Sequence, residues 1–281
     1  MAQGLNNTKR RIKSISSTRK ITKAMELVAT VKLKKWKDQM DNIVTYLDIM
    51  DKVINSASDI DDFNNIDELK RYPNATSNLY IVITSSLGLC GGYNYNIFKF
   101  LNSIITKDDK VIVIGTKGLV RFSHENINLN DEYVDLMNKI DYQKVQNLVR
   151  QIQNEYQSGN YKKVCLVSTL YKNSLNFIPT EFNLLPLAKE KNGNEIQKEI
   201  LFEPSKEEVL LNIIPKYLNS FLYGRIIEAM VCEQAARRNA MDSATDNAEE
   251  LLEKLRIEYN KVRQGAITQE ITEVVAGANN T

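Results

Sequence analysis

Residues 25–54 read MELVATVKLKKWKDQMDNIVTYLDIMDKVI, and this stretch determines the architecture. Its apolar residues follow one another at steps of three or four, and from Leu33 onward the steps mostly alternate, which is the period of a coiled coil. They are Met25, Ala29, Leu33, Trp36, Met40, Ile43, Leu47, Met50 and Ile54. A helix with one narrow apolar face needs a partner helix to cover that face. The stretch therefore predicts a long helix that pairs with another.

The C-terminal segment carries a second stripe of the same kind. Its members are Met241, Ala244, Ala248, Leu251, Leu255, Tyr259, Val262 and Ala266. The alanines allow two helix backbones to approach closely. All five prolines lie between Pro73 and Pro215, and proline breaks helix interiors, so both ends of the chain are free to be long helices. We expect the two ends to form a long antiparallel coiled coil, and a helical bundle packed end to end is the alternative.

The middle of the chain has a different pattern, with β-rich apolar runs separated by helical stretches. The runs cover residues 78–84, 111–114 and 164–168. The helical stretches lie around residues 95–105 and 141–156, and residues 182–187 form a possible further strand. Continuous apolar strands that alternate with helices predict a small, mostly parallel, Rossmann-like α/β sheet.

These patterns divide the 281 residues into three segments. Residues 1–58 are expected to form the N-terminal coiled-coil helix, residues 74–200 the central α/β domain, and residues 205–281 the C-terminal coiled-coil helix. The predicted fold class is therefore α/β plus a long antiparallel coiled coil.

Composition excludes several classes of protein. The formal net charge is only +2, and Cys90, Cys165 and Cys232 form no CxxC pair, which argues against zinc ribbons and thioredoxin-like sites. The single histidine, His124, has no Cys or His companion at ligand spacing. No run reaches the roughly 18 apolar residues of a membrane span. We expect a soluble cytoplasmic protein with reduced thiols and no metal.

One glycine-rich motif occupies the place of a phosphate-binding loop. The sequence GLCGG at residues 88–92 follows the first predicted strand and opens a helix. It lacks the Gly-Lys-Ser/Thr ending of a P-loop, is not GxGxxG, and no acidic residue follows the next strand at Ile114 to bind a ribose. A tight turn that uses glycine's conformational freedom is the favoured interpretation. We expect no catalytic residues and no cofactor.

Positive charge is concentrated near the N-terminus. Residues 9–37 contain eleven Lys and Arg residues, opposed only by Glu26. A cationic helix face favours an anionic partner, either an acidic protein surface or nucleic-acid phosphate. No aromatic residue that could stack on a base precedes Trp36, which disfavours nucleic acid.

Four sequence segments resemble the gamma subunit of F-type (F1Fo) ATP synthase. They are ITKAMELVA at residues 21–29, GLCGGYN at residues 88–94, AMDSATDN at residues 240–247 and YNKVRQGAITQEI at residues 259–271. The resemblance implies a non-catalytic central rotor shaft, whose terminal helices form a bent coiled coil inside a ring of three alpha and three beta subunits. The ring holds the nucleotide sites, and shaft rotation couples proton translocation to ATP synthesis or hydrolysis.

The resemblance also implies contacts with the beta subunits. Residues that match the contact to the beta-subunit catch are Arg263, Gln264, Thr268 and Glu270. Residues that match the shaft contact to an acidic beta segment are Lys23, Met25 and Arg237.

Contacts below the ring follow from the same resemblance. Phe202 and Glu203 match the foot that touches the c ring of the membrane sector. The implied partners are the alpha, beta and epsilon subunits and the c ring, without nucleic acid and without direct membrane insertion. The implied location is the cytoplasmic face of the bacterial plasma membrane, as a peripheral part of the complex.

Two departures from the family pattern leave alternatives open. The family usually has Asp-Arg before GLCGG, where this chain has Ser86 and Leu87, and it tends to be apolar where this chain has Arg238 and Asn239. The alternatives are a gamma-like shaft of an F1-like ATPase with an output other than proton translocation, and a basic coiled-coil protein that binds nucleic acid.

Overall fold

The computed structural model describes residues 2–57, 66, 70–125, 127–187 and 203–278. Contacts between residues divide the chain into two compact units, unit 1 with Met1–Thr30 and Arg237–Thr281, and unit 2 with Val31–Ala236. Two long helices contribute to both units, α1 (Ala2–Ala57) and α5 (Lys206–Ala278). The predicted long terminal helices are confirmed, whereas the predicted three-segment division stays a prediction.

The start of α5 has the features of a stable helix N-terminus. Ser205 precedes the helix, and its hydroxyl accepts a hydrogen bond from the Glu208 backbone N–H at 3.2 Å. Glu207 and Glu208 place negative charge in the first turn, where the helix dipole favours it. Pro215 lies inside the helix, so α5 tolerates one missing backbone donor there.

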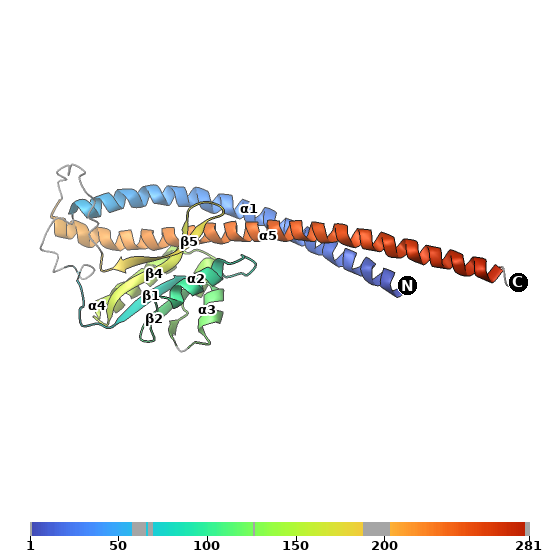
Figure 1. The fold of residues 1–281 in the computed structure, drawn as a ribbon. Coiled ribbons are helices and arrows are strands. Elements are labelled where there is room, and N and C mark those ends of the chain that lie inside the picture. Colours follow the sequence, from blue (N-terminus) through green and yellow to red (C-terminus); the bar gives the residue numbers. More distant parts are fainter. Residues whose placement is uncertain (1, 58–65, 67–69, 126, 188–202, 279–281) are drawn as a thin grey trace. The chain divides into compact units, whose positions relative to one another are not determined.

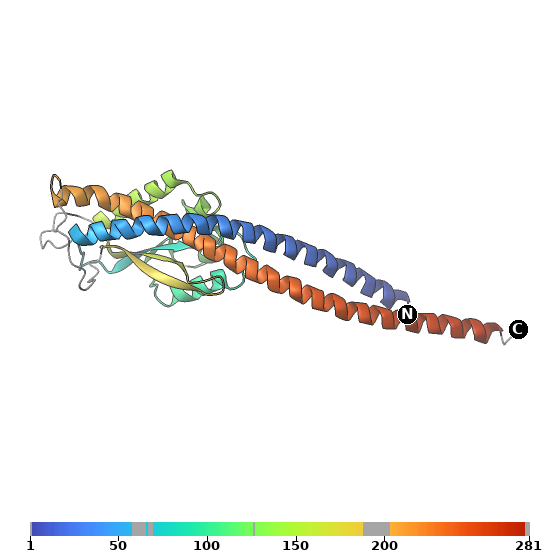
Figure 2. The ribbon, with the colours of Figure 1, turned by 90° about the horizontal axis from the view of Figure 1, so that it is seen from above.

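Unit 1 is an antiparallel pair of helices, and Figures 1 and 2 both show these parts of α1 and α5 side by side. The buried residues of its α5 seam recur at steps of four and three, as a coiled coil requires. They are Met241, Thr245, Ala248, Leu252 and Leu255. The prediction that Leu251 lies in the seam is wrong, because its side chain is 41% exposed and the neighbouring Leu252 is buried instead.

Unit 2 contains a five-stranded sheet with the order β3-β2-β1-β4-β5. The strands are β1 (Ser77–Ile83), β2 (Lys110–Ile114), β3 (Asn128–Asn130), β4 (Tyr161–Tyr171) and β5 (Phe177–Leu185). Strands β1 to β4 are parallel, and β5 is antiparallel to β4. The mostly parallel sheet is confirmed, and β3 is a strand that the apolar pattern did not predict.

The two faces of the sheet pack against different helices, because side chains alternate along each strand. On β1, Ile81 faces a cluster with α4 (Tyr142–Gln157) and residues 210–230 of α5. Its neighbour Tyr80 faces the opposite cluster, with α2 (Tyr93–Asn102) and α3 (Thr116–Phe122). The sheet is thus covered by helices on both sides, which explains its uninterrupted apolar strands.

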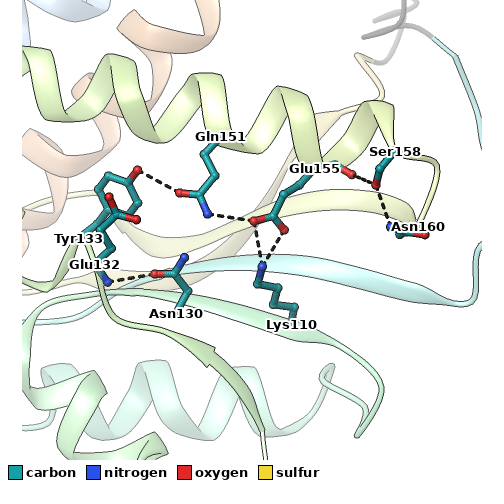
Figure 3. A network of polar contacts seen from close by, with 8 residues as sticks. All are labelled: Lys110, Asn130, Glu132, Tyr133, Gln151, Glu155, Ser158 and Asn160. Carbon is teal, nitrogen blue, oxygen red and sulfur yellow. Dashed lines mark hydrogen bonds and ion pairs between the residues drawn. The ribbon is translucent and has the colours of Figure 1, made fainter.

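A polar network fastens α4 to the strands beside it (Figure 3). Lys110 of β2 contacts both carboxylate oxygens of Glu155, at 2.8 and 2.9 Å. Gln151 donates to Glu155 at 2.9 Å and accepts from the Tyr133 hydroxyl at 3.0 Å. Tyr133 directly precedes the 3-10 helix η3 (Val134–Met137). The network is a brace between α4 and the β2 side of the sheet.

Candidate functional surface

The GLCGG motif forms the tight turn between β1 and α2. Gly91 has a φ of 56°, and Leu89 adopts the same left-handed region with a φ of 61°. The Asn94 side chain closes the turn, since its oxygen accepts from the Ser85 N–H at 3.0 Å and its nitrogen donates to the Ser85 hydroxyl at 2.7 Å. The motif is therefore a turn whose polar groups bond to one another.

The next strand-to-helix turn is also occupied by the chain itself. The Thr84 hydroxyl accepts a hydrogen bond from the Gly118 N–H at 2.9 Å, and the Ser85 carbonyl accepts one from the Lys117 N–H at 3.0 Å. A Cβ on Gly115, whose φ is 102°, would lie 2.1 Å from the backbone carbonyl oxygen of Thr84. The backbone N–H groups of Lys117 and Gly118, which could otherwise bind a phosphate at this turn, bond to Ser85 and Thr84 instead.

Helix α5 closes the crevice where folds of this type bind ligands. The crevice is expected at the carboxyl ends of β1 and β4, where the strand order reverses. There the Tyr93 hydroxyl donates to the Ala229 carbonyl at 3.3 Å, and the Cys232 thiol donates to the Thr169 carbonyl at 3.4 Å. Residues of α5 therefore bond to α2 and β4 at this end of the sheet.

Ionisable side chains are candidates to bind a metal or act as nucleophiles. Among the described residues, no three His, Cys, Asp or Glu side chains are placed to hold a metal ion. Cys90, Cys165 and Cys232 are buried and not joined in disulfides, and burial raises the pKa of the Cys232 thiol well above its ordinary value. Such thiols are poor nucleophiles.

No helix in the described part of the chain combines the length and apolar character needed to cross a membrane.

The exposed surface of unit 1 is the best remaining candidate. One groove along α1 is lined largely by cationic and small polar side chains, including Lys9, Arg10, Lys13, Ser17 and Lys20. The groove gives the basic N-terminal segment a continuous surface, as an anionic partner would require.

The C-terminal part of α5 exposes apolar side chains. No described side chain after Leu255 is fully buried, and Figures 1 and 2 show α5 continuing past the start of α1. Ile267, Ile271, Val274 and Val275 recur on one face, and Val274 is 71% exposed. A single helix with an apolar stripe normally pairs with another surface, so this end of α5 is a candidate contact region.

The predicted catch residues lie just before and along this region. Arg263, Gln264 and Thr268 are exposed on α5, and the Thr268 hydroxyl bonds to the Gln264 carbonyl at 2.9 Å within the helix. Glu270 lies on the same helix, two residues after Thr268. Their spacing brings all four residues within two helical turns of one another.

The predicted contacts to an acidic segment have mixed environments. Lys23 is exposed, Met25 is half-buried, and Arg237 is buried. Lys23 pairs with Glu26 at 2.7 Å, and its pKa is raised first by that hydrogen bond and further by the nearby charges of Asp242 and Asp246. Lys23 therefore stays positively charged at neutral pH.

The predicted foot lies at the start of α5. Glu203 is exposed in the turn before this helix, whereas Phe202 lies outside the described residues.

Sequence reasoning missed the polar members of the unit 1 seam. Thr22 is buried, and its hydroxyl lies 2.8 Å from that of Thr245. Arg19 pairs with Glu249 at 2.8 Å. The predicted apolar series begins at Met25. Continuing it backward in steps of three reaches Thr22 and Arg19, so including polar residues in the series would have found both.

Comparisons with known proteins agree along the whole chain. The family model described as ATP synthase matches residues 4–280. The ATP synthase gamma chain of Ureaplasma urealyticum is 37% identical over 297 residues, covering 98% of this chain and 99% of that protein. The ATP synthase gamma chain of Mycoplasma mobile is 40% identical over 276 residues, with 95% and 96% covered.

Solved structures share the fold. A chain of the Euglena gracilis mitochondrial ATP synthase OSCP/F1/c-ring assembly matches with a TM-score of 0.69 and 16% identity, covering 99% of this chain and 95% of that one. A chain of the Tetrahymena thermophila mitochondrial ATP synthase central stalk and c ring matches with a TM-score of 0.56 and 20% identity, covering 80% and 99%.

Proposed function

The chain belongs to the ATP synthase gamma-chain family, and on that premise we propose that it is the central rotor shaft of an F-type ATP synthase. Rotation of the shaft couples proton translocation to ATP synthesis or hydrolysis in a ring of alpha and beta subunits. The chain contributes no chemistry of its own, because the ring holds the nucleotide sites.

The observation that carries the proposal is the apolar face at the C-terminal end of α5. Ile267, Ile271, Val274 and Val275 are exposed on a helix that has no helical partner within the described residues there. Exposed aliphatic surface on an isolated helix is stabilised when a partner covers it. A ring with an apolar inner surface provides such cover without fixing the helix to one subunit.

The charged residues of unit 1 then determine which beta subunit is engaged. We assign Arg263, Gln264, Thr268 and Glu270 to the contact with the beta-subunit catch. Lys23, Met25 and Arg237 are assigned to the shaft contact with an acidic beta segment, for which the basic groove supplies further positive charge. Each rotation angle presents a different set of contacts, which biases the conformational equilibrium of each beta subunit.

The remaining partners lie below the ring. The α/β domain of residues 74–200 is assigned to the epsilon subunit and the c ring, with Phe202 and Glu203 as the foot. The complex is expected at the cytoplasmic face of the bacterial plasma membrane, with this chain as a peripheral subunit.

Co-purification from membranes tests the proposal. Affinity-tagged chain should recover alpha and beta subunits in equal amounts, together with epsilon and c subunits. Recovery of the hexamer without c subunits would indicate a different output, and a salt-sensitive nucleic-acid complex without the hexamer would refute the rotor function.

A further inference from the structure

A charged clamp in unit 2 joins α5 to two strands of the sheet. Arg225 donates from Nη1 to Oε2 of Glu228 at 2.6 Å, and Oε1 of Glu228 accepts from the Tyr171 backbone N–H at 2.9 Å. Tyr171 is the last residue of β4, so one carboxylate connects the helix to the end of this strand.

The other side of the Arg225 guanidinium is fixed by aromatic rings. Its Cζ lies 3.9 Å from the centroid of the Phe182 ring on β5 and 4.9 Å from that of Phe221 on α5. A guanidinium stacked on a ring and paired with a carboxylate has little freedom to move. Arg225 therefore connects α5 to β5, while Glu228 connects it to β4.

These contacts differ in kind from the apolar packing around them. Leu222, Ile226 and Met230 of α5 are buried in the core cluster on the same sheet face. Hydrophobic contact is non-directional and permits small sliding movements. The Glu228–Tyr171 hydrogen bond and the Arg225–Phe182 contact both depend on geometry, so they resist displacement of α5 against the hairpin of β4 and β5. The Arg225–Glu228 pair within α5 holds the two side chains in place.

We propose that Arg225 and Glu228 are positioning residues that lock α5 to the β4–β5 hairpin, so that torque carried by α5 reaches the α/β region without slip. The proposal rests on the proposed rotor function. Helix α5 is continuous from Lys206 to Ala278 and connects the two regions along the chain. The lock matters only when the shaft works against a load, because an unloaded shaft transmits no torque to the sheet.

The test compares loaded and unloaded turnover in the assembled complex. Glu228→Leu removes the acceptor of the Tyr171 N–H, and Arg225→Met keeps an apolar chain over Phe182 but removes the guanidinium. Both variants should keep the ATP hydrolysis rate of the alpha-beta-gamma subcomplex. In membrane vesicles both should lower the number of protons pumped per ATP hydrolysed, and Arg225→Lys should restore part of the loss.

The matched control is another Arg–Glu pair of unit 2. Arg121 of α3 pairs at 2.8 Å with Glu125, which lies in the turn after this helix, so Arg121→Met and Glu125→Leu should leave the pumping ratio unchanged. The proposal is overturned if the Arg225 and Glu228 variants pump normally, or if they lower unloaded hydrolysis as much as pumping. Failure of the wild-type chain to assemble with alpha and beta subunits would refute the rotor function instead, before any variant is compared.

Discussion

The hydroxyl of Thr245 on α5 donates a hydrogen bond to the hydroxyl of Thr22 on α1 at 2.8 Å, across 223 positions of sequence. Both side chains are buried in the seam of unit 1. The Thr22 hydroxyl also lies 3.0 Å from the Arg19 carbonyl, so each polar atom has a partner. The two hydroxyls therefore link α1 and α5 within this seam.

Replacing these threonines tests the contribution of the pair to stability. Thr22→Val alone should lower the free energy of unfolding by about 1 kcal/mol, because it removes the buried bond between the two hydroxyls, while Thr245 keeps the Met241 carbonyl as an acceptor at 2.8 Å. The double variant with Thr245→Val should be close to wild type, since it leaves no hydroxyl to satisfy. Urea unfolding of the full chain, followed by helical circular dichroism, measures the coupling. Additive losses in the double variant would show that the hydroxyls do not interact.

The ion pair beside it should contribute less. Arg19 and Glu249 are partly and largely exposed, and exposed pairs stabilise proteins by roughly 0 to 1 kcal/mol. Glu249→Gln should therefore shift the free energy of unfolding by less than about 1 kcal/mol, and the shift should vanish at high salt. A larger, salt-independent effect would contradict this assignment.

Two glycines of α5 should respond oppositely to alanine. A Cβ on Gly224 would lie 2.8 Å from Cγ2 of Ile43, whereas a Cβ on Gly265 would meet nothing within 4 Å. Gly265→Ala should stabilise the helix by about 1 kcal/mol through propensity. Gly224→Ala should destabilise the chain, because overpacking costs roughly 1 to 3 kcal/mol and exceeds that gain. Thermal unfolding of both variants measures the two changes in stability. A Gly224→Ala chain that is more stable than wild type would refute the close packing of α1 and α5 in unit 2.

Alkaline pH should destabilise unit 2 partly through Tyr80. Burial raises the pKa of Tyr80 to about 12, with a smaller opposing effect from Lys163. Its stabilising contribution is therefore complete below the ordinary tyrosine pKa of about 10 and is lost as the pH rises towards 12. Tyr80→Phe should flatten the fall in unfolding free energy over this window. Parallel curves for the two chains between pH 10 and pH 12 would contradict a raised pKa.

The catch assignment predicts a functional loss. Arg263→Ala with Gln264→Ala should lower the ATPase turnover of the reconstituted complex, because both side chains are exposed and available to a partner. Arg150→Ala, an exposed arginine on α4, is the matched charge-removal control. Unchanged turnover and torque would remove Arg263 and Gln264 from the contact residues.

The apolar end of α5 gives a separate prediction for assembly. Ile271→Asn with Val274→Asn should weaken recovery of the chain with alpha and beta subunits, because both side chains are exposed on the proposed contact face. Thr272→Asn is the control, because its hydroxyl bonds to the Thr268 carbonyl of its own helix. Equal recovery of all variants would mean that this face does not contact the ring.

Much of the fold could be predicted because its apolar pattern is strong. The strands β1, β2 and β4 each contain an uninterrupted apolar run, since helices cover both faces of the sheet. Strand β3 has only three residues, with the single apolar Leu129, and so carries no periodic signal. Helix α3 begins within a Gly-Thr-Lys-Gly sequence that resembles a loop, and its glycines are explained by the nearness of Thr84 and Val113 and by the positive φ of Gly115.

Contacts between distant polar residues could not be predicted from the sequence. Nothing in the local sequence connects Glu228 with the Tyr171 N–H, or Arg225 with Phe182, because these pairs depend on where α5 crosses the sheet. The proposed contact residues on α5 were identified from resemblance. Their physical signature, exposed polar side chains followed by an exposed apolar stripe, becomes visible only when burial is known.

The closure of the sheet crevice by α5 has a consequence for inhibition. A drug-like molecule directed at the ends of β1 and β4 would have to displace Tyr93 and Cys232 from their bonds to neighbouring backbone, and with them a turn of helix. Inhibitors of this subunit should therefore be sought by screening intact assemblies. There a compound can bind at the interface between this chain and a neighbouring subunit.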